Sequence, residues 1–88
     1  MSHRLIFRSR AKRSLAAIWM SAGGRGAVTR ASDRLERRLR NDPASVGESR
    51  TARVRVAVFD PLVVFYTVDL ADRLVTVLDI RSHAPPRP

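Results

Sequence analysis

The chain has 88 residues, which is enough for one small domain but not for two. Its 17 lysine and arginine residues outnumber its eight acidic residues, so the formal net charge is +9, and it has no cysteine. These numbers exclude a disulfide scaffold and a thiolate metal site, so the core has to form by apolar burial alone.

Residues 4–8 predict a short strand, and Ser9 is a suitable N-cap for the helix that follows. Because Arg8 and Arg10 come after only three apolar residues, the sequence predicts no secretory signal. The later apolar runs are also broken by charge well short of the roughly 18 residues that span a bilayer. We therefore expect a cytoplasmic protein with no membrane partner.

The first helix is predicted from apolar residues that recur on one face, namely Ala11, Leu15, Ile18, Trp19 and Ala22. We expect Leu15, Ile18 and Trp19 to be core residues. Gly23-Gly24 ends this helix, and we interpret it as a helix linker rather than a phosphate cradle, because no strand precedes it.

A second helix is predicted over residues 27–40, where Asn41-Asp42-Pro43 ends it. Its apolar stripe includes Leu35, an expected core residue, and its other side carries Arg30, Arg34, Arg37 and Arg38. Two amphipathic helices joined by a glycine-rich turn form a helical hairpin.

Residues 42–50 predict a polar loop, after which the apolar period changes from that of a helix to that of a strand. Strands are expected over residues 52–59, 62–68 and 73–80, and short turns between them predict an antiparallel meander. The nearly all-apolar run 62–68 predicts a central strand covered on both faces, with Val64 and Tyr66 in the core. Strict alternation would place Val75, Val77 and Asp79 on one face of the last strand.

The predicted fold is therefore α+β, in the order β-α-α-β-β-β. The helical hairpin is expected to pack on one face of a twisted, mainly antiparallel four-stranded sheet. We expect residues 1–83 to form a single domain and residues 84–88 a short proline-rich tail.

The net charge of the chain comes entirely from its first half. Residues 1–40 hold eleven basic residues and two acidic ones, whereas residues 41–88 hold six of each. Such polarity indicates a polyanionic partner, either nucleic acid or an acidic protein segment. The expected partner-binding residues are Arg10, Arg13, Arg30, Arg34, Arg37 and Arg38.

Metal and cofactor chemistry are not predicted, because the two histidines and the carboxylates show no ligand spacing and no nucleophile motif is present. Among the enzymatic activities considered, metal-free RNA cleavage fits the residues better than metal-dependent or serine-hydrolase chemistry. It needs an acid, a base and cations that stabilise the charge of the transition state. Arg53, Arg55, Arg81 and His83 are the candidate catalytic residues if they meet on the open face of the sheet.

Three segments resemble the RelE/ParE superfamily of toxins from type II toxin–antitoxin systems. The first runs from Arg4 to Trp19 and carries the Leu15–Ile18–Trp19 helix face; the others are Pro61–Asp69, with Val-Val-Phe-Tyr-Thr-Val-Asp, and Thr76–Ile80. The resemblance covers roughly residues 4–83. It implies a small cytoplasmic toxin that an acidic antitoxin neutralises.

The superfamily has two branches, and the resemblance is closer to the second. RelE-like toxins cleave mRNA on the ribosome with basic residues of the sheet and a C-terminal tyrosine or histidine–tyrosine pair, whereas ParE-like toxins act on DNA gyrase. Here Val63 and Val64 stand where a RelE-like toxin has an arginine, and no tyrosine follows His83. The resemblance therefore implies a ParE-like gyrase inhibitor. The alternatives are a RelE-like mRNA endonuclease and a non-toxic nucleic-acid-binding module.

Overall fold

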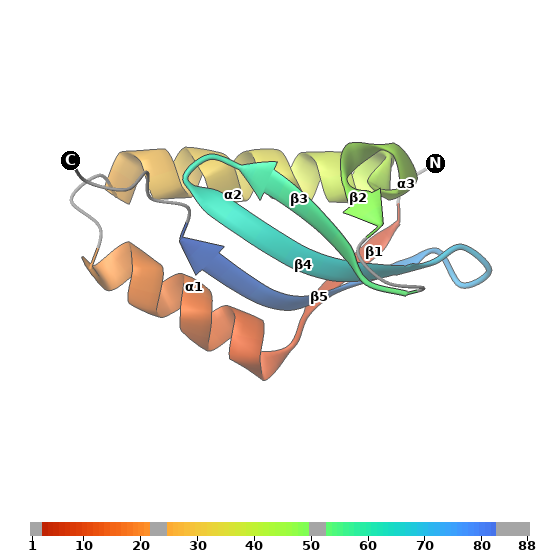
Figure 1. The fold of residues 1–88 in the computed structure, drawn as a ribbon, viewed down its shortest axis with the longest axis horizontal. Helices are drawn as coiled ribbons and strands as arrows, with labels where there is room; N and C mark the ends of the chain where they lie inside the picture. The colour runs from red at the N-terminus through yellow and green to blue at the C-terminus, as the bar shows by residue number, and fades with distance from the viewer. Residues whose placement is uncertain (1–2, 22–24, 50–52, 83–88) are drawn as a thin grey trace.

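The computed structural model describes residues 3–21, 25–49 and 53–82. Its elements follow the predicted β-α-α-β-β-β order, with two short elements added in the middle (Figure 1). They are β1 (Arg4–Phe7), α1 (Ser9–Ser21), α2 (Arg25–Asn41), α3 (Pro43–Val46), β2 (Glu48–Ser49), β3 (Arg55–Phe59), β4 (Leu62–Asp69) and β5 (Leu74–Ser82). The expectation of a plain loop over residues 42–50 is wrong, because α3 and β2 lie there. The predicted Gly23-Gly24 turn, His83 and the tail 84–88 lie outside the described residues.

The strands form one sheet in the order β1-β5-β4-β3-β2. β1 pairs in parallel with β5, from Arg4 opposite Leu74 to Phe7 opposite Val77, and the other pairs are antiparallel. The predicted, mainly antiparallel four-stranded sheet is confirmed; the parallel pairing of β1 makes it a mixed sheet, and the two-residue β2 extends its β3 edge.

The helices and one face of the sheet enclose the core. α1 contributes Ala11, and α2 contributes its whole apolar stripe. Leu35, Val64 and Tyr66, three of the predicted core residues, are fully buried, whereas Leu15 and Ile18 are half-buried and pack against the core. The buried core consists of Ala11, Val28, Ala31, Leu35, Leu39, Ala57, Phe59, Leu62, Val64, Tyr66, Val75, Val77 and Ile80.

The central strand β4 is covered on one face only. Its residues alternate between full burial, as at Val64 and Tyr66, and half-burial, as at Val63 and Phe65. The expectation of burial on both faces is therefore wrong. Both helices lie on the same side of the sheet, and apolar β-branched residues tolerate the half-buried side as well as the core.

A β-bulge in β5 changes which residues of that strand reach the core. Phe65 is opposite Asp79 and Tyr66 is opposite Val77, so Leu78 is an extra residue in the ladder. Beyond the bulge the alternation shifts by one residue, which buries Ile80 and turns Asp79 away from the core. The predicted common face for Val77 and Asp79 is therefore wrong.

The α3–β2 segment is fixed to the sheet by side chains that bind its backbone carbonyls. The hydroxyl of Tyr66 donates a hydrogen bond to the Pro43 oxygen at 3.0 Å. Nη2 of Arg55 donates to the oxygens of Ala44, at 2.6 Å, and Gly47, at 2.5 Å. A one-turn helix cannot satisfy its last carbonyls by itself, so these bonds stabilise a segment with little intrinsic helical stability.

Replacing Tyr66 with phenylalanine should lower the free energy of unfolding by about 1–2 kcal/mol, because it removes a buried hydrogen bond and leaves the Pro43 oxygen without its donor. Urea denaturation followed by circular dichroism measures this change. An unchanged midpoint would show that water replaces the hydroxyl and that this bond does not hold α3 in place.

Candidate functional site

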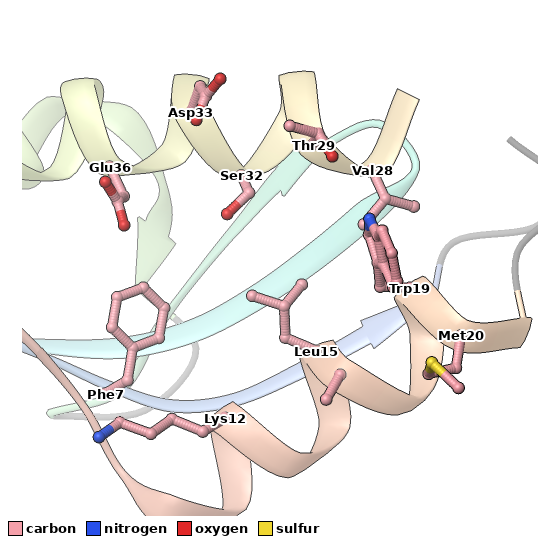
Figure 2. Close-up of a pocket in the computed structure, with 11 residues that line it drawn as sticks. Phe7, Lys12, Leu15, Trp19, Met20, Val28, Thr29, Ser32, Asp33 and Glu36 are labelled. Atoms are coloured by element: carbon pink, nitrogen blue, oxygen red, sulfur yellow. The ribbon is translucent and has the colours of Figure 1, made fainter. Parts of the chain in front are cut away.

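A groove of about 520 Å³ lies between α1 and α2 and is the main candidate binding site. α1 contributes apolar side chains, among them Leu15 and Trp19, and the Phe7 ring of β1 closes one end. Figure 2 shows Leu15 and Trp19 pointing from α1 toward α2, where Trp19 stands beside Val28. The groove is lined by Phe7, Lys12, Leu15, Ala16, Trp19, Met20, Val28, Thr29, Ser32, Asp33 and Glu36.

Trp19 belongs to this groove rather than to the core, so its predicted core role is wrong. Its side chain is 40% exposed, and the neighbouring Met20 is 66% exposed. The guanidinium carbon of Arg25 lies 4.7 Å from the centre of the Trp19 ring, a cation–π contact. The apolar stripe of α1 is wider than the part that the sheet covers, and the remainder forms one wall of the groove. Exposed apolar side chains gathered in this way mark an interaction site.

The charged residues of the groove are not the arginines that the sequence singles out. Its rim carries Lys12 from α1 and Asp33 and Glu36 from α2. The helical wheel of α2 places Arg34 and Arg38 on the other side of the apolar stripe. The groove thus combines an apolar wall with a rim of both charges, which suits an amphipathic helix better than a nucleic acid.

The predicted partner-binding arginines fall into separate groups. A smaller hollow beside β3 is lined by Arg34, Arg37 and Arg38. Arg10, on α1, instead forms an ion pair with Asp79 of β5. Arg13 and Arg30 are exposed. The six residues therefore do not form one continuous surface.

The candidate catalytic residues are only partly brought together. Arg53 and Arg55 share a hollow of about 680 Å³ with Arg8, but Arg55 is already bonded to two backbone carbonyls and its Nε is buried. Arg81 lies outside this hollow. In the sheet register it pairs with Val63 of β4, whereas Arg55 pairs with Tyr66, three residues further along the same strand. His83 lies outside the described residues.

Asp79 anchors a charged cluster that the sequence did not reveal, because strict alternation placed it on the same face of the strand as Val75 and Val77. Its Oδ1 accepts hydrogen bonds from the Ser14 hydroxyl and from the Ile80 amide, each at 2.9 Å. Its Oδ2 lies 3.8 Å from Nε of Arg10 and 3.7 Å from Nε of Arg81. Arg81 also lies over the Phe65 ring, 5.2 Å from its centre. The cluster ties α1 to the last strand and orients Arg81.

The environment of Asp79 lowers the pKa of its carboxyl group. Burial alone would raise this pKa, but the hydrogen bonds from Ser14 and Ile80 and the charges of Arg10 and Arg81 together outweigh burial. The carboxylate should therefore stabilise the fold above the unfolded-state pKa of 3.8, and its contribution should fade as the pH falls below that value.

Asp79→Asn should consequently destabilise the chain most near neutral pH and progressively less in acid. Thermal unfolding of both proteins between about pH 7 and pH 2.5 measures the difference. Ser14→Ala removes one of the bonds to the carboxylate and should reduce the same pH-dependent difference without abolishing it. A difference that stays constant across this range would show that Asp79 acts only through packing.

Neither a membrane span nor a metal centre is found in the parts of the chain that the structure describes. Within residues 3–21, 25–49 and 53–82, no helix is both long and apolar enough to cross a bilayer. The same residues contain no group of three or more histidine and acidic side chains that could hold a metal ion.

Comparison with known proteins decides the family. The model of the ParE toxin of the type II toxin–antitoxin system parDE matches residues 5–85. The chain belongs to the ParE toxin family. No curated protein matches this ParE-family sequence.

Solved structures share the ParE-family fold at low sequence identity. The RelBE2 toxin–antitoxin complex from Mycobacterium tuberculosis matches with a TM-score of 0.78 and 18% identity, over 97% of this chain and 95% of that chain. The chromosomal ParDE system from P. aeruginosa matches with a TM-score of 0.68 and 19% identity, over 94% of this chain and 98% of that chain. The isolated E. coli RelE toxin matches with a TM-score of 0.67 and 15% identity, over 98% of this chain and 89% of that chain. The fold is thus common to RelE and ParE toxins and does not by itself separate their activities.

Proposed function

We propose that this chain is the toxin of a type II toxin–antitoxin pair, that DNA gyrase is its target, and that an antitoxin neutralises it by binding in the α1–α2 groove. The observation that carries the proposal is the ParE family match over residues 5–85. Two of the similar solved structures, RelBE2 and ParDE, are toxin–antitoxin systems, which supports an antitoxin as partner.

The sheet supports a gyrase target over RNA cleavage. Of the arginines considered for catalysis, Arg55 binds the carbonyls of Ala44 and Gly47, and Arg81 is held by Asp79. A side chain committed to such structural bonds is a poor stabiliser of a developing phosphorane charge, because that role needs a free, preorganised donor. Val63 and Val64, in the central strand, add no cation.

The groove supports an antitoxin segment that forms an amphipathic helix. Trp19 and Met20 expose apolar surface on one wall, and such a surface is covered by the apolar face of a helix laid into the groove. Aromatic residues of this kind provide much of the binding energy at interfaces. The mixed charges of Lys12, Asp33 and Glu36 would fix the orientation of the bound helix.

The target is tested with the purified chain in two parallel reactions. One contains bacterial DNA gyrase and relaxed plasmid; the other contains ribosomes translating a defined mRNA. The proposal predicts loss of supercoiling or accumulation of cleaved DNA, with the mRNA intact. Cleaved mRNA with unaffected gyrase would replace the proposal by the endonuclease alternative, and no effect in either reaction would overturn toxin activity itself.

The groove is tested with Trp19→Glu and the cognate antitoxin. A charge placed on the apolar wall should weaken the complex by at least about tenfold, measured by isothermal titration calorimetry. Arg4→Gln, an exposed substitution on β1 outside the groove, is the control and should bind like the unchanged chain. Equal affinities for all three proteins would place the antitoxin elsewhere.

A further inference from the structure

The two walls of the α1–α2 groove carry opposite charges. Lys12 lies on the α1 wall, whereas Asp33 and Glu36 lie on the α2 wall. Figure 2 shows Lys12 and Glu36 near the same end of the groove, where Phe7 lies. None of these three charged side chains has an ion-pair partner among the residues that the structure describes. Each wall therefore leaves a charge available to a molecule that enters the groove.

The groove is also the place in the helical hairpin where negative charge gathers. Residues 1–40 hold eleven basic residues and two acidic ones, and both acidic residues line the groove. Elsewhere the excess of positive charge repels a second copy of the chain. At the groove the two carboxylates balance Lys12 and Arg25, which lies over the Trp19 ring. Local charge therefore favours this face over the rest of the hairpin for contact between copies.

The groove walls match each other when two copies face one another about a twofold axis along the groove. Such an axis places α1 of one copy over α2 of the other and keeps every residue at its position along the groove. Lys12 of each copy then lies level with Glu36 of the other (Figure 2). The exposed Trp19 and Met20, toward the other end, are covered by the α2 wall of the second copy. Aromatic residues and methionine are enriched in the buried centre of such interfaces.

We propose that the chain without its antitoxin forms a homodimer through the α1–α2 groove, with a Lys12–Glu36 ion pair on each side of the twofold axis. A second copy is the occupant because it brings an apolar wall, a cation and an anion at matching positions. Nucleic acid is a poor occupant, since the groove carboxylates repel phosphates. The dimer does not depend on gyrase being the target. It covers the site proposed for the antitoxin, so the two are mutually exclusive, and this consequence alone rests on the proposed function.

Trp19 is the only tryptophan of the chain, so intrinsic fluorescence reports directly on the groove. Dilution of the full chain from about 200 μM to about 0.2 μM, which brackets a micromolar Kd, should shift its emission to longer wavelength. Analytical ultracentrifugation over the same range should show the mass fall from two chains to one. A constant emission and the mass of one chain at every concentration would overturn the proposal.

Charge reversal tests the contact itself. Lys12→Glu and Glu36→Lys should each raise the dimer Kd by about tenfold or more, because like charges then meet at both symmetric positions. An equimolar mixture of these two variants should dimerise like the unchanged chain, since opposite charges again face each other at both positions. Arg30→Glu makes the same charge change as Lys12→Glu on an exposed part of α2 outside the groove, and should change the Kd by less than about twofold. A dimer that Lys12→Glu does not weaken, an equal effect of Arg30→Glu, or a mixture that stays monomeric would each contradict the proposal.

Cross-linking locates the interface. Lys12 is the only lysine of the chain, so a carbodiimide, which joins an amine to an adjacent carboxylate, should give a covalent dimer linked between Lys12 and Glu36. Mass spectrometry of the digested dimer identifies this link, and a dimer linked only through other carboxylates would overturn the proposal. The cognate antitoxin should suppress the link. A link that persists in the antitoxin complex would move the antitoxin site away from the groove and leave the dimer supported.

Discussion

Gly47→Ala should destabilise the folded chain by about 2–3 kcal/mol, near the upper end of the cost of overpacking. A methyl group at this position would lie 2.5 Å from the backbone oxygen of Val56 and 2.7 Å from the hydroxyl of Tyr66. Both distances are far shorter than a van der Waals contact. The effect does not depend on backbone conformation, since Gly47 has a φ of −114°, which any residue adopts.

Neither the Val56 oxygen nor the Tyr66 hydroxyl can move away from the added methyl group without breaking other contacts. The Val56 oxygen belongs to a strand that pairs with β2 on one side and β4 on the other. The Tyr66 side chain is fully buried, and its hydroxyl is bonded to Pro43. Relief of the clash would therefore displace the α3–β2 segment, together with the bonds that Arg55 makes to it.

The matched control is Gly26→Ala in α2. There the nearest atom to the added methyl group is Nη1 of Arg30, at 3.2 Å, the end of a flexible exposed side chain. Alanine is the better helix former, so this variant should be as stable as the unchanged chain or more stable by up to about 1 kcal/mol. Urea denaturation gives both values, and two variants of equal stability would show that the α3–β2 segment yields to the methyl group.

The contrast between α2 and the α3–β2 segment shows why some parts of the fold could be predicted from the sequence and others could not. α2 repeats an apolar stripe over many residues, so its periodicity alone predicts the helix and the burial of Leu35. α3 and β2 are too short for any period, and distant side chains, Tyr66 and Arg55, hold them in place. Such contacts depend on the tertiary fold and leave no local pattern.

The α1–α2 groove and the Asp79 cluster were not predicted because they too depend on tertiary contacts. Periodicity shows that Trp19 lies on the apolar face of its helix, but not how far the sheet extends beneath that face. It likewise cannot show the bulge at Leu78, which exposes Asp79 to Ser14 and to the arginines.

Leu35→Ala is expected to destabilise the chain by about 2–5 kcal/mol, the cost of removing a large aliphatic side chain from a packed core. Leu35, on α2, is fully buried in the core, so a cavity would remain where its methyl groups were. In a chain of this size such a loss is a large part of the total stability. The measurement is again urea denaturation, with circular dichroism as the probe.

Trp19→Ala is the comparison that separates the core from the groove. The tryptophan is the larger side chain, yet it is 40% exposed and lines an open groove, so its removal should cost only about 1–2 kcal/mol, less than truncating a packed aromatic residue. The order of the two effects is therefore the reverse of the order of side-chain size. If Trp19→Ala were instead the more destabilising, the tryptophan would hold α1 and α2 together, and its exposure could not be taken as a sign of a binding surface.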